Sequence, residues 1–231
     1  MTSDLGSAAE KVYANSGNLE VLSKVPEDAK KILDIGCGAG DNARQLMRED
    51  RTIIGLTLSE DEAKIAGEFC DRVIVANVEQ GLPEPMSGVD VAICSHILEH
   101  ICFPEKLLAG VRQSLSPNGR LIVALPNLMW YRTRFRILMG RFEYEPHGIM
   151  DNTHFRWYTF KSAQRMLEQN GYVVESAHAK GDLPLGPIRR LLPKSWFVFP
   201  DKLACRVFPG LFGFQMVFCV RASSDAESQS A

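Results

Sequence analysis

Hydrophobic and polar residues follow one another along this chain in blocks that predict strands and helices in turn. Short, nearly continuous apolar runs predict buried strands at residues 32–35, 51–58, 73–75, 89–95 and 120–125. Apolar residues at helical spacing predict the intervening helices at residues 41–48, 59–69 and 104–115. Strands that alternate with helices are typical of a parallel sheet covered on both faces.

A glycine-rich turn joins the first predicted strand to the first helix. It reads Asp-Ile-Gly-Cys-Gly-Ala-Gly over residues 34–40. Three glycines at alternate positions permit backbone angles and a close ligand approach that a Cβ would block. Dinucleotide-binding turns carry Gly-x-Gly-x-x-Gly instead, so the spacing and the preceding acid disfavour a nicotinamide-linked oxidoreductase.

Asp-x-Gly-x-Gly-x-Gly at a strand end resembles the first motif of the class I S-adenosylmethionine (SAM) dependent methyltransferases. Leu-Ser-Pro-Asn-Gly from residue 115 is similar to their third motif. The resemblance implies an α/β, Rossmann-like sheet of seven mostly parallel strands, with residues 172–178 as strand six and 214–220 as an antiparallel edge strand. It implies SAM as cofactor, held by Asp34, Gly36, Cys37, Gly38, Gly40, Thr57, Leu58, Asn77, Val78 and Ser95.

Two of these positions depart from the motif. Most relatives have Asp or Glu where Thr57 stands, because a carboxylate accepts two hydrogen bonds from the ribose hydroxyls. Gly-Leu-Thr-Leu-Ser, residues 55–59, resembles cyclopropane fatty acid synthase-like methyltransferases, which tolerate Thr there. Asn77 takes a place that is often Asp beside adenine, where an amide oxygen can accept the same hydrogen bond, or it only favours a turn.

Polar and aromatic residues are densest between residues 140 and 159. Gly-Arg-Phe-x-Tyr and Asp-x-Thr-His-Phe-Arg-x-Tyr-Thr resemble bacterial methyltransferases of types 11, 12 and 23, which are linked to polysaccharide and glycolipid biosynthesis. Quinone-ring O-methyltransferases also carry Thr-His in this region. The expected reaction is therefore O-methylation of a small-molecule, glycan or lipid-linked acceptor.

Three side chains are candidates for catalysis. His154 is the expected base for the acceptor hydroxyl, since imidazole is mostly neutral near pH 7, and Asp151 is expected to fix its tautomer. His154 as a side chain that only pins the loop stays an alternative. His100 lies in Leu-Glu-His after the fourth strand. If that segment is helical, His96 and His100 share a face and could hold a metal, but without a third ligand no metal site is predicted.

We expect one domain, residues 1–222, with lid segments at about 128–158 and 181–213 and a disordered tail at 223–231. Broken helices over residues 5–24 are expected to cover the cofactor. Basic and aromatic residues in 181–213 fit either a packed substrate lid or a peripheral membrane contact. Arg132, Arg134 and Arg136 could bind a substrate anion or only solvate a helix.

Composition and charge narrow the partners. A net charge of −2 over 231 residues disfavours nucleic acid. The six cysteines lack a Cys-x-x-Cys spacing and read as core residues in a reducing compartment, and the first residues show no leader, so a cytoplasmic location is the default expectation. The rival function is a SAM-fold module like the MetW-like proteins, which would act through a partner without turnover of its own.

Overall fold

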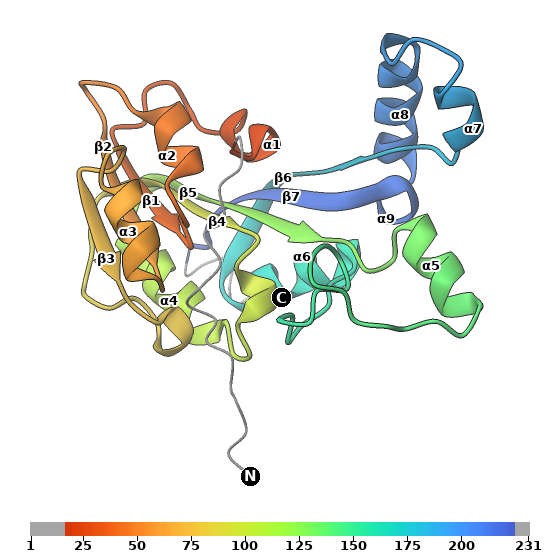
Figure 1. Ribbon diagram of the computed structural model, residues 1–231. Coiled ribbons are helices and arrows are strands. Elements are labelled where there is room, and N and C mark those ends of the chain that lie inside the picture. Colours follow the sequence, from red (N-terminus) through yellow and green to blue (C-terminus); the bar gives the residue numbers. More distant parts are fainter. Residues whose placement is uncertain (1–16, 225–231) are drawn as a thin grey trace.

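The computed structural model describes residues 17–224, and their centre is a seven-stranded sheet (Figure 1). In spatial order the strands run β3-β2-β1-β4-β5-β7-β6. The first five pair in parallel, and β7 is antiparallel to both of its neighbours. The strands are β1 (Lys31–Ile35), β2 (Thr52–Thr57), β3 (Arg72–Val75), β4 (Val89–Ser95), β5 (Leu115–Pro126), β6 (Tyr172–Gly181) and β7 (Gly213–Ala222).

The sequence led us to expect the antiparallel strand at the edge of the sheet, and that prediction is wrong. β7 lies between β5 and β6, and β6 forms the edge. The reason lies in burial: Met216, Phe218 and Val220 are buried on one face of β7, and Val217 and Cys219 on the other. A strand with apolar side chains on both faces belongs inside a covered sheet.

Helices pack on both faces of this sheet. Those that cover the sheet are α1 (Leu19–Leu22), α2 (Asp41–Leu46), α3 (Glu60–Ala66), α4 (Glu105–Ser114) and α6 (Phe160–Gln169). Helix α5 (Tyr131–Leu138) lies beyond the end of β5 (Figure 1). Two 3₁₀ turns, η2 (Val78–Gln80) and η3 (Leu98–His100), follow β3 and β4. Thr159 caps α6 by accepting a 3.1 Å hydrogen bond from the Ser162 backbone amide.

Successive strand residues enter two different cores because side chains alternate across a strand. Leu33 and Ile35 of β1 pack with α4 and α6, whereas Ile32 packs with α2 and α3. All three side chains have no exposed surface. The central strands are thereby fixed between two apolar layers, and only their ends can carry a site.

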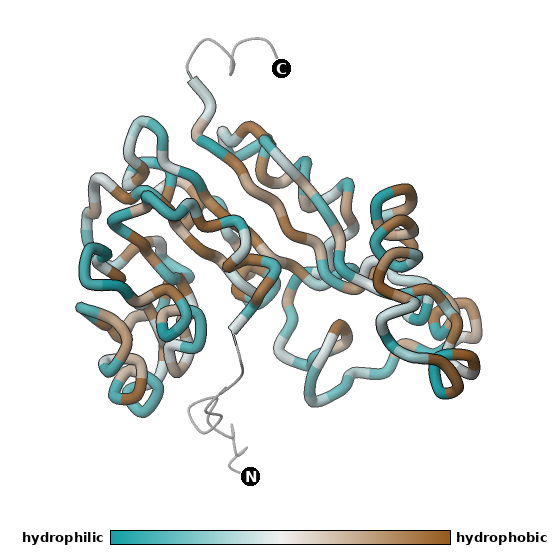
Figure 2. Tube along the Cα trace, turned by 90° about the horizontal axis from the view of Figure 1, so that it is seen from above, coloured by the Kyte–Doolittle hydropathy of each residue, from teal (hydrophilic) through white to brown (hydrophobic). Residues whose placement is uncertain are grey.

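A second group of helices lies beyond the ends of β6 and β7. It consists of α7 (Gly186–Arg189), α8 (Ser195–Val207) and α9 (Pro209–Phe212). Figure 1 shows α7 and α8 standing apart from the helices that cover the sheet, and Figure 2 shows apolar stretches along them. No helix among residues 17–224 has the length and apolar character needed to cross a bilayer.

Parts of the predictions for the chain ends fall outside the described residues. These are the part of the predicted helical segment before residue 17 and the tail from residue 225. Within the described range, only α1 represents the broken helices expected over residues 5–24. All six cysteines are free thiols, and all but Cys102 are buried, as expected of core residues.

Candidate functional site

Most of the predicted cofactor residues lie at the carboxyl ends of four neighbouring strands, on one side of the sheet. β3, β2, β1 and β4 run in parallel and end at Val75, Thr57, Ile35 and Ser95. In open α/β sheets ligands bind outside such strand ends. The order β3-β2-β1-β4 reverses direction next to β1, so the glycine turn lies at the point where a crevice is expected.

The glycine turn has the backbone that its sequence predicts. Gly36, Gly38 and Gly40 all have positive φ, at 73°, 53° and 84°. A Cβ on Gly36 would lie 2.9 Å from the Ile97 side chain. The amides of Gly36 and Cys37 both donate to the Leu56 carbonyl, at 2.9 and 2.8 Å, which fixes the turn against β2. Gly36 is exposed, so its backbone is open to solvent at the carboxyl end of β1.

Asp34 is buried below this turn without the partners that a carboxylate needs. Only 1% of its surface is exposed, and neither carboxylate oxygen has a hydrogen-bond partner. Burial raises the pKa of Asp34 to about 7, although the nearby Asn42 side chain acts in the opposite direction. An unsatisfied buried acid at a ligand site fits a cationic or hydrogen-bond-donating ligand.

A carboxylate lies beside Thr57 after all. The Thr57 hydroxyl donates a 2.6 Å hydrogen bond to Oε2 of Glu62, and both side chains are buried. Glu62 lies in the first turn of α3, in the helix predicted over residues 59–69. Its distance of five residues from Thr57, across the turn from β2 into α3, was the available signal.

The remaining predicted cofactor residues differ in their surroundings. Oδ1 of Asn77 caps η2 by accepting from the Glu79 amide at 2.9 Å, and Val78 is buried beneath it. Leu58, directly after β2, is 64% exposed. The Ser95 hydroxyl accepts a 3.1 Å hydrogen bond from the side-chain amide of Asn18. These four residues lie at or just after the carboxyl ends of β2, β3 and β4, on the same side of the sheet as the glycine turn.

His96 and His100 do not share a helix face, so the condition stated for a metal held by this pair is not met. His96 has φ of 57°, the one positive value outside glycine among residues 17–224, and it precedes η3 rather than belonging to a helix. Its Nδ1 lies 3.1 Å from Glu99 Oε1 and its Nε2 3.1 Å from Gln215 Oε1. Burial would lower the pKa of His96, but the bonds to Glu99 and Gln215 outweigh it and raise that pKa.

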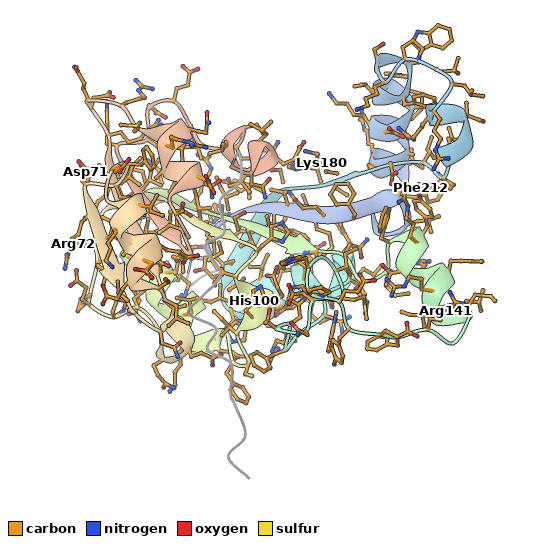
Figure 3. All side chains as sticks on the ribbon, in the orientation of Figure 1. Asp71, Arg72, His100, Arg141, Lys180 and Phe212 are labelled. Carbon is orange, nitrogen blue, oxygen red and sulfur yellow. The ribbon has the colours of Figure 1, made fainter. Side chains whose placement is uncertain are left out.

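A different cluster forms where η3 meets the loop before α6. Glu99, His100 and His154 each offer a ligand atom, and these atoms lie within 4.8 Å of one another. Amides of Phe155 and Arg156 donate to the Glu99 carbonyl at 2.9 and 3.1 Å, which ties the loop to η3. Figure 3 labels His100 at this junction. We refer to Glu99, His100 and His154 as the Glu-His cluster.

Hydrogen bonds fix which ring nitrogen each histidine presents. Nδ1 of His154 lies 3.2 Å from the Ile149 carbonyl and therefore donates, which leaves Nε2 with a lone pair. Nδ1 of His100 lies 3.2 Å from the Thr153 carbonyl and 3.1 Å from its hydroxyl. Burial lowers the pKa of His154, against the opposing effect of Glu99, so the ring is neutral near pH 7.

Asp151 acts on a different histidine from the one expected. Ile149, and not Asp151, sets the tautomer of His154. Asp151 instead accepts from the Thr153 amide and hydroxyl, at 2.8 and 2.6 Å, and Thr153 contacts His100. Burial would raise the pKa of Asp151, but these bonds and the two histidines lower it. The carboxylate thus orients His100 through Thr153.

The three arginines of α5 have partners within the protein. Arg132 pairs with Asp182 at 2.9 Å, Arg134 donates to the Met129 carbonyl at 2.6 Å, and Arg136 pairs with Glu145 at 2.7 Å. These contacts favour a structural role for the arginines over a substrate-anion site.

Comparison with known proteins agrees with this geometry. A methyltransferase domain family model matches residues 8–177, well over half of the chain. A mitochondrial ubiquinone biosynthesis O-methyltransferase of Mus musculus is 27% identical over 164 residues, which cover 65% of this chain and 43% of that protein. Its counterpart in Thiobacillus denitrificans is 30% identical over 106 residues, or 43% and 45% of the two chains. The matched part spans less than half the length of these relatives.

Solved structures share the fold at low identity. A SAM-dependent methyltransferase from Archaeoglobus fulgidus superposes with a TM-score of 0.60 at 18% identity, covering 85% of this chain and 87% of that one. A methyltransferase-like protein from Bacillus halodurans gives a TM-score of 0.62 at 15% identity, with 89% and 98% covered. These likenesses establish the sheet architecture, whereas the site rests on the residues above.

Proposed function

Since the chain belongs to the methyltransferase domain family and folds as a class I SAM-dependent methyltransferase, we propose that it transfers a methyl group from SAM to a hydroxyl oxygen of a small-molecule acceptor. The single observation that carries the choice of oxygen is the Glu-His cluster beside the strand ends that would hold the cofactor. A hydroxyl must lose its proton during transfer, and this cluster presents two imidazole nitrogens and a carboxylate for that purpose.

The residues at the strand ends fit SAM. The open glycine turn leaves room for a ligand on the backbone, and the unsatisfied carboxylate of Asp34 suits the cationic methionine part. Glu62, joined to Thr57, is the carboxylate we assign to the ribose hydroxyls, and Asn77 and Leu58 are assigned to adenine. When bound, SAM supplies an electrophilic methyl group on a sulfonium.

A phenolic acceptor is the first class to test, and glycan and lipid-linked acceptors are the next. The relatives with the names given above act in ubiquinone biosynthesis, and quinone precursors carry ring hydroxyls. A ring hydroxyl ionises near pH 10, so a neighbouring basic cluster can deprotonate it at moderate cost. A sugar hydroxyl is a weaker acid than a ring hydroxyl, so the same cluster would need a stronger base to deprotonate it.

The first experiment is calorimetry with SAM and its demethylated product, with NADH as control, followed by turnover assays on dihydroxylated phenols, sugars and glycolipids. We expect saturable binding of SAM and of its demethylated product, S-adenosylhomocysteine (SAH). We expect no binding of NADH, and methyl transfer to at least one phenol. Binding of SAM with no transfer to any acceptor would replace this proposal with the partner-dependent module. A folded protein that binds neither SAM nor SAH would contradict the cofactor assignment.

Proton release is expected when SAM binds. The pKa of Asp34 is raised to about 7 by burial, so the protonated form dominates at pH 6, and a cationic ligand favours the ionised form. SAM affinity should therefore rise with pH through this range and level off above it. Calorimetry at pH 6 in buffers of different ionisation enthalpy measures the released proton. Asp34→Asn should abolish the release, and a wild-type protein that releases none would refute the role of Asp34.

A further inference from the structure

The Glu-His cluster has the geometry of a metal centre. Oε2 of Glu99 is buried without a hydrogen-bond partner, and the whole residue has no exposed surface. Both histidines have their Nδ1 engaged by main-chain or hydroxyl oxygens, so each presents the Nε2 lone pair. One ligand atom from each of the three residues lies within 4.8 Å of the other two. Such donors repel one another unless a proton or a cation lies between them.

Further contacts hold each donor in place, as is typical of metal ligands. The Ile149 carbonyl orients His154. Thr153 orients His100, and the Thr153 hydroxyl is itself fixed by its hydrogen bond to Asp151. His96 binds the other oxygen, Oε1, of Glu99 at 3.1 Å and so leaves Oε2 for the centre of the cluster. Metal-binding histidines usually donate their second ring N–H to a carbonyl or carboxylate in this way.

We propose that Glu99, His100 and His154 bind a divalent transition-metal ion, with Zn²⁺, Co²⁺, Mn²⁺ and Fe²⁺ as the candidates. Two imidazoles with one carboxylate suit these ions better than Mg²⁺ or Ca²⁺, which prefer oxygen ligands alone. Ligands about 2.1 Å from one ion lie roughly 3–4 Å apart, so small side-chain rotations close the cluster.

The role of this ion rests on the proposed function. An acceptor hydroxyl bound to the cation has a lower pKa, so its O–H bond breaks and the proton leaves to solvent. The oxygen lone pair then forms the new bond to the methyl carbon, while the C–S bond of SAM breaks and its electrons stay on sulfur. In this arrangement His154 is a ligand, and the cation replaces it as the group that ionises the acceptor.

Metal titration of the full chain tests the site directly. Protein stripped with EDTA and dialysed is titrated with ZnCl₂ by calorimetry and with CoCl₂ by visible absorption. We expect one ion per chain, and an affinity at least about 100-fold lower in Glu99→Gln and in His154→Ala. His147→Ala, an exposed histidine of the same loop, should bind as wild type does. If Glu99→Gln unfolds, His100→Ala, which is only partly buried, takes its place.

Two results would overturn the metal site: no saturable binding to stripped wild-type protein, or unchanged affinity in the folded ligand variants. These outcomes are separable from the proposed function. Metal binding without methyl transfer would leave the site and remove the reaction, whereas full turnover after complete chelation would leave the reaction and remove the role of the ion in it.

A separate observation concerns the surface of α7 and α8, residues 188–208. Large apolar side chains stand in solvent there, which is unusual for a monomeric protein. Trp196 is 65% exposed, Phe199 76% and Leu191 84%. The exposed cations Arg190, Lys194, Lys202 and Arg206 lie among them. Asp201 is the one acid in this range, and it pairs with Arg189.

We infer that this surface docks on an anionic lipid bilayer. Aromatic side chains between basic ones match the interfacial layer of a membrane, where rings enter the headgroup region and cations meet lipid phosphates. A second copy of the chain fits less well, because its own α7–α8 surface would bring like charges together.

Co-sedimentation with vesicles tests this surface. We expect the protein to pellet with vesicles of equal parts phosphatidylglycerol and phosphatidylcholine, to stay in the supernatant with phosphatidylcholine alone, and to be released by salt. Trp196→Ser with Phe199→Ser should abolish binding, and Leu138→Ser on α5, also exposed, should not. Failure to pellet with the anionic vesicles, or a concentration-dependent dimer that the double variant disrupts, would overturn the inference.

Discussion

His154→Ala should lose about 10²–10⁴-fold in methyl transfer while SAM binding stays unchanged. The residue belongs to the Glu-His cluster, which lies past the end of β4, whereas the glycine turn and Glu62 belong to β1, β2 and α3. Removing the ring therefore takes away acceptor activation and leaves the cofactor contacts intact. The effect holds whether Nε2 takes a proton or binds a cation. Steady-state rates with the best phenolic acceptor, together with calorimetry for SAM, measure both quantities.

His147→Ala is the matched control for this variant. It removes the same side chain from the same loop, but at an exposed position, and wild-type rates are expected. Thermal unfolding of both variants checks that the loop remains folded. Retained turnover in a folded His154→Ala protein would show that this histidine only holds the loop, as the alternative from the sequence states.

Gly36→Val should weaken SAM binding by at least about 100-fold. Neither the backbone conformation at Gly36 nor the space around its Cα accommodates a side chain. Gly36 has φ of 73°, a region that β-branched residues avoid, and an added Cβ would lie 2.9–3.2 Å from three atoms of Ile97. The side chain would also stand on the backbone that the cofactor is proposed to cover. Calorimetry with SAM and SAH measures the loss.

Two further variants make the Gly36 result interpretable. Gly210→Ala, at a glycine with open space around its Cβ position, should bind SAM normally. Glu62→Gln keeps the glycine turn but removes the charge proposed to face the ribose, so a loss of about tenfold is expected. Undiminished SAM affinity in a folded Gly36→Val protein would place the cofactor elsewhere.

Local signals in the sequence predicted much of the fold. The apolar run of residues 89–95 is β4 without a shift, and the helix predicted from residue 59 begins there, with Ser59 as the N-cap of α3. Three glycines after an apolar strand predicted the turn that all later geometry depends on. In each case neighbouring residues determine the structure, because strand burial, helix capping and positive φ are local properties.

What sequence reasoning missed depends on how segments come together in the fold. Glu99 and His154 are brought together by main-chain bonds from the loop before α6 to η3, and no spacing rule predicts that pairing. Glu62 reaches Thr57 only because β2 turns directly into α3. The position of β7 inside the sheet likewise follows from which strands pair, whereas alternation shows only that a strand exists.

The interior position of β7 also determines when the sheet can be completed during synthesis. β6 has one neighbour, β7, and the three helices α7, α8 and α9 are made between them. Until Gly213–Ala222 has left the ribosome, the free edge of β5 and the whole of β6 have nothing to pair with. A nascent chain cut short before that strand would carry two open strand edges, which makes it a target for chaperones and for aggregation.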